Sequence, residues 1–235
     1  MRQSGRIESS QAAAAPSGGH AGGRARIGVL GGTFNPPHLG HVALARHARE
    51  ELGLGTVLLM PAYTAPNKRS EHDDPGPEHR LAMCRLAVVG EPGVKASGRE
   101  IDRGGVSYTV DSLQAIHDED PDVELTFIVG ADTACTLAGW REPARVLSLA
   151  GLAVAERDGL GREDVREALL GLHPSPRLVF LAMDELAVSS SAVRERVAQG
   201  LPVQELVGER VAAYIAEHGL YRSAPAGVAA IGGVA

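Results

Sequence analysis

The sequence predicts an α/β fold: a Rossmann-like, doubly wound parallel sheet with helices on both faces. Three observations support this prediction. Short apolar runs that suit buried strands recur along the chain, stretches with helical periodicity separate them, and a pair of glycines follows the first run directly. Strands that alternate with helices build parallel sheets, because each crossover helix returns the chain to the edge from which the next strand starts.

Length and composition indicate one globular domain with tails. The chain has 235 residues, 44% of them hydrophobic and 22% charged, which is enough for a full core. Residues 1–24 and 223–235 are rich in small residues without periodicity. We therefore expect disordered tails on either side of a domain over residues 25–222.

Charge and cysteine content exclude several classes of partner. The formal net charge of −6 disfavours nucleic acid, so anionic substrates would have to be attracted by a local pocket. No apolar run approaches the roughly 20 residues of a membrane span, and the N-terminus has no signal-peptide core. Cys84 and Cys135 lack metal-ligand spacing and are expected to be buried free thiols. We expect a cytoplasmic protein without membrane or nucleic-acid partners, and the sequence leaves a homo-oligomer open.

The first strand and the helix after it carry the most informative motif. Residues 27–30 are an apolar strand, and Gly31 and Gly32 are expected to turn the backbone tightly and to let it approach a ligand. Pro36 and Pro37 have a fixed φ and no donor, which suits the entry to a helix. The free N–H groups and dipole of that helix start predict an anion site.

Two histidines, His38 and His41, lie three residues apart at this helix start. The spacing places both imidazoles on one side of the opening turn. Imidazole donors, glycines and a helix N-terminus together favour a phosphate site. Two alternatives remain open. The first is that both histidines are solvated surface residues. The second is that they are two ligands of a zinc site, although this helix supplies no third ligand and no H-E-x-x-H pattern.

The second strand is expected over residues 56–61, and the loop of residues 62–77 follows it. This loop contains Lys68, one of only two lysines in the chain beside Lys95. Ligands of open α/β sheets bind at the carboxyl ends of strands, so Lys68 is a candidate ligand contact. The alternative is a solvated loop charge.

A helix over residues 78–89 and a short strand over residues 94–96 come next. After them, Ser107 or Thr109 is expected to cap a helix and to aim free N–H groups towards the ligand side. Plain capping without ligand contact explains the pattern equally well.

The strand expected over residues 125–129 is followed by Gly130 and Asp132. An acidic residue at such a strand end commonly binds ribose hydroxyls. Trp140, the only tryptophan, is expected in a loop between helices. Its indole would either stack on a flat heterocycle or pack at the rim of the core.

Two more strands, expected over residues 152–155 and 178–181, complete the sheet, with a helix over residues 163–171 between them. A closing helix is expected over residues 203–218, and Gly219 is its C-cap signal.

The run of three serines before this closing helix predicts a second anion site. Ser189 and Ser190 place hydroxyls at a helix start, and Arg194 follows one turn later. A simple capping run is the alternative. Together with the first site, two phosphate-binding helix starts on one sheet suit a triphosphate.

These motifs carry a resemblance to a known family. G-G-T-F-N-P-P-H-L-G-H, from Gly31, resembles the signature of the H-x-G-H nucleotidyltransferases, with Asn35 where many members have Asp. Residues 26–221 resemble the bacterial nicotinate-nucleotide adenylyltransferase family. Further matches are the P-x-x-x-x-P-x-K loop, S-Y-T-V-D-S-L, G-A-D with Trp140 after it, V-S-S-S-A-V-R and V-x-x-Y-I-x-x-x-G-L-Y. The family loop usually reads P-H-K, where this chain has Asn67 before Lys68, and its last site has threonine where this chain has Ser191.

The resemblance implies transfer of AMP from ATP to nicotinate mononucleotide, with Mg²⁺ carried on the ATP phosphates. It implies three kinds of contact. The catalytic residues are His38, His41, Lys68 and Arg194; the ATP contacts are Gly31, Gly32, Thr33, Phe34, Gly130, Asp132, Ser189 and Ser190; the mononucleotide contacts are Lys68, Tyr108, Thr109 and Trp140; and no residue is expected to be a dedicated metal ligand.

Three rival functions stay open. One is another H-x-G-H nucleotidyltransferase such as a phosphopantetheine adenylyltransferase, which should lack the G-A-D to Trp140 block. The others are a non-catalytic nucleotide sensor on the same fold and a metallohydrolase that uses His38 and His41. The choice between nicotinate and nicotinamide mononucleotide is not encoded in any of these motifs.

Overall fold

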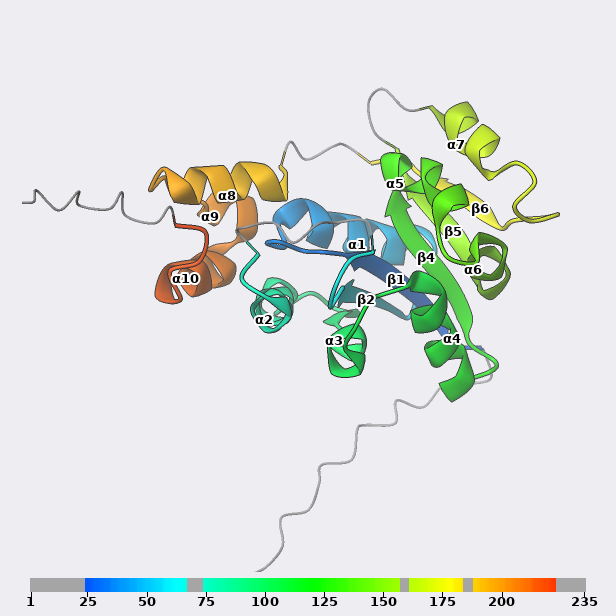
Figure 1. The fold of residues 1–235 in the computed structure, drawn as a ribbon, viewed down its shortest axis with the longest axis horizontal. Helices are drawn as coiled ribbons and strands as arrows, with labels where there is room; N and C mark the ends of the chain where they lie inside the picture. Colours follow the sequence, from blue (N-terminus) through cyan, green and yellow to red (C-terminus); the bar gives the residue numbers. More distant parts are fainter. Residues whose placement is uncertain (1–23, 67–73, 157–160, 184–187, 223–235) are drawn as a thin grey trace, which may run out of the picture.

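The computed structural model describes residues 24–66, 74–156, 161–183 and 188–222 (Figure 1). A six-stranded parallel sheet with the order β3-β2-β1-β4-β5-β6 forms its centre, which confirms the doubly wound α/β prediction. The strands are β1 (Arg26–Gly32), β2 (Thr56–Pro61), β3 (Val94–Ala96), β4 (Glu124–Gly130), β5 (Ala150–Ala155) and β6 (Leu178–Leu181). The helices are α1 (Leu39–Glu51), α2 (Pro77–Ala87), α3 (Arg99–Arg103), α4 (Thr109–Glu119), α5 (Ala131–Cys135), the 3-10 turn η1 (Leu137–Gly139), α6 (Pro143–Leu149), α7 (Arg162–Leu169), α8 (Ser190–Ala198), α9 (Gln204–Val207) and α10 (Glu209–Glu217).

Some expectations concern parts of the chain that the structure does not describe. Lys68 lies outside the described residues. So do the tails expected over residues 1–24 and 223–235, apart from Arg24.

The central strands are buried on both faces, which is why they read as apolar runs. Val29 and Leu30 of β1 are paired in register with Phe127 and Ile128 of β4. Val29 and Phe127 belong to one hydrophobic cluster, and Leu30 and Ile128 belong to another. Because successive side chains of a strand point to opposite faces, these two clusters are the two faces of the sheet.

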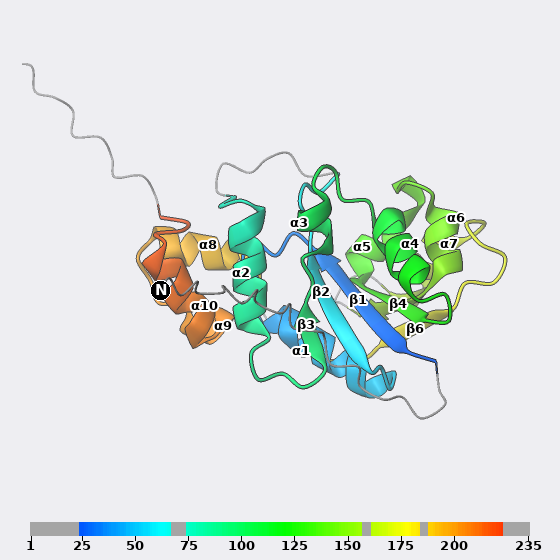
Figure 2. The same ribbon diagram turned by 90° about the horizontal axis from the view of Figure 1, so that it is seen from below.

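Helices cover each face with small or branched side chains. On one face α1 packs through Ala45 and Ala48, which are completely buried. On the other, α4 packs through Leu113 and Ile116 (Figure 2). The sheet is therefore enclosed by helices, and its strand ends are the remaining places for a ligand.

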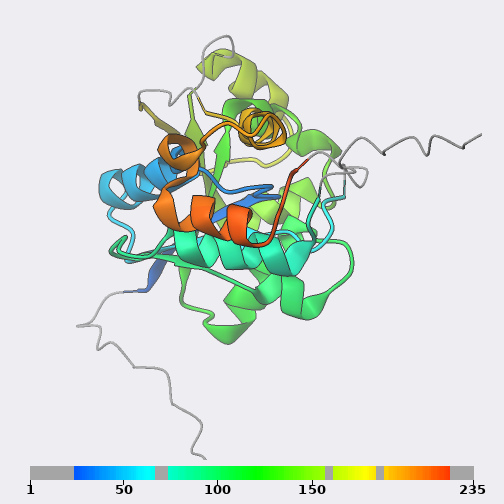
Figure 3. The same cartoon turned by 90° about the vertical axis from the view of Figure 1, so that its left-hand side faces the viewer.

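A third cluster lies beside the sheet and holds the C-terminal helices. Met83 of α2 packs with Val193 of α8 and with Val211 and Ile215 of α10. Figure 3 shows α10 running alongside α2. This cluster places the end of the described chain close to the loop that follows β1.

The glycine pair after the first apolar run is part of the strand and not a turn, contrary to the prediction. Gly31 and Gly32 remain in β1 and lie in register with Met60 and Pro61 of β2. The backbone turns later, at Phe34, whose φ of 52° lies in the left-handed region. The expectation of a glycine turn was wrong because the parallel ladder with β2 continues to the last residue of that strand.

One helix boundary agrees with expectation and another differs. Pro36 and Pro37 precede α1, which begins at Leu39 with His38 as its N-cap. The single closing helix is in fact two helices, because Gly208, with φ of 80°, separates α9 from α10. Of the residues described, none form a helix both long and apolar enough to cross a membrane.

Candidate active site

The candidate site lies where β1 and β4 end side by side in the middle of the sheet. The chain continues from β1 to β2, which pairs with the edge of β1 that faces away from β4. It continues from β4 to β5, which pairs with the edge of β4 that faces away from β1. The direction of winding reverses at this point, and open α/β sheets bind ligands at such a switch point. Residues 33–38, called the β1–α1 loop below, follow the first of these two strand ends.

The predicted histidine pair lies at the start of α1 with its two rings in contact. The ring centroids of His38 and His41 are 3.7 Å apart, with an angle of 27° between the planes. The backbone N–H of His38 donates to Nδ1 of His41 over 3.2 Å. Because Nδ1 accepts this bond, the neutral ring of His41 carries its proton on Nε2. His41 therefore presents a donor at Nε2, as a phosphate requires.

Packing fixes this ring orientation. The ring of Phe34 meets His41 edge-on at 4.8 Å. His38 is only 7% exposed. A Cβ placed on Gly40 would lie 3.1 Å from Nδ1 of His38 and 3.2 Å from Cγ1 of Val188. The glycine of the H-x-G-H motif thus lets the His38 ring and the segment before α8 come close to the first turn of α1.

The second predicted anion site is joined directly to the first. Ser189 is the N-cap of α8 and its Oγ accepts from the backbone N–H of Ala192 over 3.1 Å. Ser190 Oγ donates to the carbonyl of Pro36 over 2.9 Å. Arg194 Nη1 donates to the carbonyl of Asn35 over 2.8 Å. The two helix starts therefore share one loop, as the triphosphate prediction requires.

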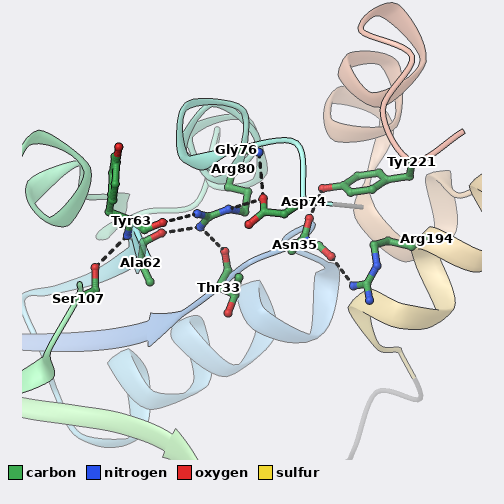
Figure 4. Close-up of polar contacts among 10 residues, drawn as sticks. All are labelled: Thr33, Asn35, Ala62, Tyr63, Asp74, Gly76, Arg80, Ser107, Arg194 and Tyr221. Carbon is green, nitrogen blue, oxygen red and sulfur yellow. Dashed lines mark hydrogen bonds and ion pairs between the residues drawn. The ribbon is translucent and has the colours of Figure 1, made fainter. Parts of the chain in front are cut away.

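Asn35 is the centre of these contacts. Its side chain is only 3% exposed, and its Oδ1 accepts from the hydroxyl of Tyr221 over 2.8 Å (Figure 4). Its carbonyl accepts from Arg194. Tyr221 follows α10, so the loop contacts elements from both ends of the described chain. In the sequence, Tyr221 stands out only as the last residue of the V-x-x-Y-I-x-x-x-G-L-Y motif.

Arg80 of α2, which sequence analysis did not single out, holds the ends of β1 and β2 together. Its side chain is 1% exposed and donates to three carbonyls: Thr33 at 2.8 Å, Ala62 at 2.6 Å and Tyr63 at 3.0 Å. Its Nε pairs with the carboxylate of Asp74 at 3.0 Å. Figure 4 shows this fan of contacts beside the β1–α1 loop.

A signal for Arg80 was present in the sequence. It stands three and four residues before Met83 and Cys84, which are fully buried on α2. Helical spacing places all three on the same face. An arginine on an apolar face requires several acceptors, because an unpaired buried charge is costly.

Neither Ser107 nor Thr109 caps a helix, contrary to the prediction, and Thr109 is the first residue of α4. The N-cap of α4 is Tyr108, and no side chain caps it. Ser107 Oγ instead accepts from the backbone N–H of Tyr63 over 2.9 Å. The cap prediction failed because the hydroxyl of Ser107 is bonded to groups outside α4, namely Tyr63 and Glu100.

A buried carboxylate supports the same region. Glu100 of α3 is 7% exposed and accepts from Ser112 Oγ over 2.5 Å, and it is also hydrogen-bonded to Ser107. Burial raises the pKa of Glu100, while the two serines and nearby Arg103 lower it by a smaller amount. Glu100 thereby ties α3 to the start of α4, where the predicted mononucleotide contacts Tyr108 and Thr109 lie.

Trp140 packs at the rim of the core. Its ring meets Phe127 at 5.9 Å and 72°, and its Nε1 donates to Thr136 Oγ1 over 3.0 Å. Near it, the guanidinium of Arg141 lies 4.7 Å from the ring centroid of Tyr108. The structure therefore shows the rim packing of Trp140. Stacking of its half-buried indole on a ligand stays a prediction.

The two residues predicted to contact adenosine lie together at the end of β4. A Cβ on Gly130 would lie 2.7 Å from Oδ1 of Asp132. The glycine thus allows the exposed carboxylate of Asp132 to fold back over the strand end. Of the two thiols expected to be buried, Cys84 is buried, while Cys135, in the same short helix as Asp132, is only partly so.

The described residues contain no cluster of metal ligands. In those parts of the chain, no group of three or more His, Cys, Asp or Glu side chains could hold a metal ion. The groups gathered at the β1–α1 loop are imidazole and guanidinium donors, whereas Mg²⁺ prefers oxygen ligands. A divalent ion at this site would therefore depend on oxygens that a nucleotide supplies.

Comparison with known proteins gives consistent relatives. The family model described as "Cytidylyltransferase-like" matches residues 29–196. The "Probable nicotinate-nucleotide adenylyltransferase" of Roseiflexus sp. (strain RS-1) is 44% identical over 200 residues, which cover 84% of this chain and 98% of that protein. The protein of the same name from Herpetosiphon aurantiacus is 38% identical over 83% of this chain and 98% of its own length.

A solved structure shares the fold. Nicotinic acid mononucleotide adenylyltransferase of Plasmodium falciparum, complexed with NaAD, superposes with a TM-score of 0.68 at 16% sequence identity. The match covers 84% of this chain and 98% of that one.

Proposed function

This chain belongs to the cytidylyltransferase-like family and, within it, to the nicotinate-nucleotide adenylyltransferases, and we infer that it transfers AMP from ATP to nicotinate mononucleotide. The products are deamido-NAD and pyrophosphate, and the reaction is a step of NAD biosynthesis. The enzyme is a nucleotidyltransferase on a Rossmann-like sheet. Its two cysteines are free thiols, which supports the proposed cytoplasmic location.

One observation carries the proposal for the ATP site. The start of α1, with His38 and His41, follows directly on the β1–α1 loop. Ser190 and Arg194, from the start of α8, donate to backbone carbonyls of the same loop. Donors and positive charge from two helices thus converge on one place. A triphosphate is the nucleotide moiety that such an arrangement suits.

The chemistry follows from charge. The nucleophile is the 5′-phosphate of the mononucleotide, which is ionised at neutral pH, so no side-chain base is needed. The enzyme has to align two anions and stabilise the charge that develops around the α-phosphorus. We assign the Nε2–H of His41 to that charge, with His38 and Arg194 on the neighbouring phosphate oxygens. Lys68, which lies outside the described residues, is assigned from its motif alone to the mononucleotide and to the charge around the α-phosphorus.

Mg²⁺ would be held by the ATP phosphates, where it would neutralise part of their charge. The chain's own contribution is the set of N–H donors described above. Gly31, Gly32 and Thr33 would line the phosphates with backbone, and Ser189 would present the start of α8.

The remaining assignments concern the two bases. Gly130 and Asp132, at the end of β4, would face the adenosine. Tyr108, Thr109 and Trp140 would hold the pyridine mononucleotide. Since the indole N–H of Trp140 already donates to Thr136, its ring face is the part available for stacking.

The test is a pyrophosphate-release assay with ATP–Mg²⁺ and one acceptor at a time. Nicotinate mononucleotide, nicotinamide mononucleotide and phosphopantetheine are the acceptors. We expect the fastest release with nicotinate mononucleotide. Faster release with phosphopantetheine would assign the chain to the rival nucleotidyltransferase, and ATP binding without release with any acceptor would make it a nucleotide sensor.

A further inference from the structure

Tyr221, which follows α10, has an uncommon backbone conformation and no role in the proposed reaction. Its φ is 61°, in the left-handed region that bulky residues rarely adopt. Such conformations persist only where the surrounding structure enforces them, and they concentrate near functional sites. We therefore looked for the contact that this conformation allows Tyr221 to make.

Tyr221 makes one hydrogen bond to a residue near the other end of the described chain. The hydroxyl of Tyr221 donates to Oδ1 of Asn35 over 2.8 Å, although the two residues are 186 positions apart. Asn35 is almost fully buried. Burial and the nearby carboxylate of Asp74 raise the pKa of Tyr221, while Arg194 and Arg80 lower it by less. The phenol therefore stays protonated and remains a donor.

Asn35 is held on its other side by the second anion site. Its carbonyl accepts from Arg194, and the carbonyl of Pro36 accepts from Ser190. Figure 4 shows Asn35 between Tyr221 and Arg194. Asn35 stands three residues before His38, so its position sets where the imidazole pair begins.

We propose that Tyr221 is a positioning residue for the ATP site, which fixes Asn35 and thereby holds the β1–α1 loop where His38 and His41 meet the phosphates. The inference rests on the proposed function, because it takes ATP as the ligand of this loop. Tyr221 acts through Asn35 and does not itself contact the nucleotide.

The test compares two variants that each lose one phenol hydroxyl. Tyr221→Phe removes the bond to Asn35. Tyr214→Phe is the matched control, because Tyr214 lies on α10 and its hydroxyl is bonded to Nδ1 of His79 at 2.9 Å, away from the loop. Affinity for a non-hydrolysable ATP analogue with Mg²⁺ is measured by calorimetry, and KM for each substrate by pyrophosphate release.

For Tyr221→Phe we expect an approximately 3- to 10-fold loss of analogue affinity and a similar rise in KM for ATP, the effect of one hydrogen bond. KM for nicotinate mononucleotide should change less than about 2-fold, and Tyr214→Phe should leave both values unchanged. Equal effects of the two variants on ATP affinity would mean that Tyr221 only stabilises the segment, and would overturn the proposal.

A double mutant tests whether the effect passes through Asn35. If it does, Asn35→Ala combined with Tyr221→Phe should bind the analogue no more weakly than the worse single variant. Full additivity of the two losses would overturn the proposal. Wild-type chain that binds the analogue but releases no pyrophosphate would refute the proposed reaction, while the binding comparison would still decide the role of Tyr221.

Discussion

Replacing Arg80 with methionine should destabilise the protein strongly, because it removes the buried donors that join the ends of β1 and β2. The methionine fills similar apolar volume but supplies no donor. Asp74 loses its ion pair, and the carbonyls of Thr33, Ala62 and Tyr63 lose their donors.

The size of the effect follows from these contacts. Removing one partner of a buried ion pair costs about 3–5 kcal/mol. The buried carbonyl of Ala62, left without its donor, adds about 1–3 kcal/mol. The carbonyls of Thr33 and Tyr63 add less, because their bonds are only partly buried and water can replace the lost donor. Because Asp74 is partly exposed, its lost ion pair costs less than the fully buried case. We therefore expect the ion pair and the carbonyls together to cost about 3–5 kcal/mol. For a domain of this size that lowers Tm by roughly 6–20 °C.

Urea unfolding followed by circular dichroism measures this loss directly. Arg85→Met is the matched control, because Arg85 lies on the same helix and is exposed; its effect should stay within about 0.5 kcal/mol. Arg80→Lys should lie between the two, since an ammonium keeps the charge but not the planar fork. A loss below about 1 kcal/mol for Arg80→Met, equal to that of Arg85→Met, would refute the role of Arg80 as the link between β1 and β2.

Three further predictions concern the site. His41→Ala should lower kcat by roughly 100-fold or more while KM for ATP changes little, as for loss of a donor that acts mainly in the transition state; steady-state kinetics that show the reverse split would reject the assignment. Gly40→Ala should lower kcat/KM for ATP by several-fold, because its Cβ would force the ring of His38 or the side chain of Val188 to move; unchanged kinetics would mean that this close approach is not needed. Glu100→Gln should become more stable relative to wild type as pH rises from about 4 to about 8, since burial raises the pKa of Glu100 in the folded state and disfavours its ionised form.

The sign of the Glu100 prediction comes from proton linkage. A carboxyl whose pKa is raised by folding holds its proton more tightly in the folded than in the unfolded state. The stabilisation from this tightly held proton is thus complete below the pKa that Glu100 has in the unfolded chain. It is lost as the pH rises through the pKa that Glu100 has in the folded protein. Thermal melts of both proteins across this range measure the difference. A difference in Tm that does not change with pH would contradict the argument.

The elements that sequence analysis predicted correctly are those whose signal is local. The apolar runs of β1, β2, β4 and β5 identify buried strands, because the pattern depends only on the strand itself. His38 and His41 lie on one side of the first turn of α1, as their spacing predicts, and the cap at Ser189 follows from the preference of hydroxyls for N-cap positions.

The features that escaped prediction depend on partners far away in the sequence. Gly31 and Gly32 continue the strand because β2 lies beside them, which no property of the glycines reveals. Ser107 finds its donor on Tyr63, at the end of another strand. Tyr221 and Asn35 meet only because α10 packs on α2. Long-range contacts of this kind need the assembled fold before they become visible.

The contact between Asn35 and Tyr221 also has a consequence for the order in which the enzyme becomes competent. During translation the β1–α1 loop is made early, whereas its tyrosine partner is among the last residues of the described chain to be synthesised. The nascent polypeptide can assemble most of the sheet before that partner leaves the ribosome. The full affinity of the β1–α1 loop for ATP should therefore be reached only after Tyr221 has left the ribosome and bonded to Asn35.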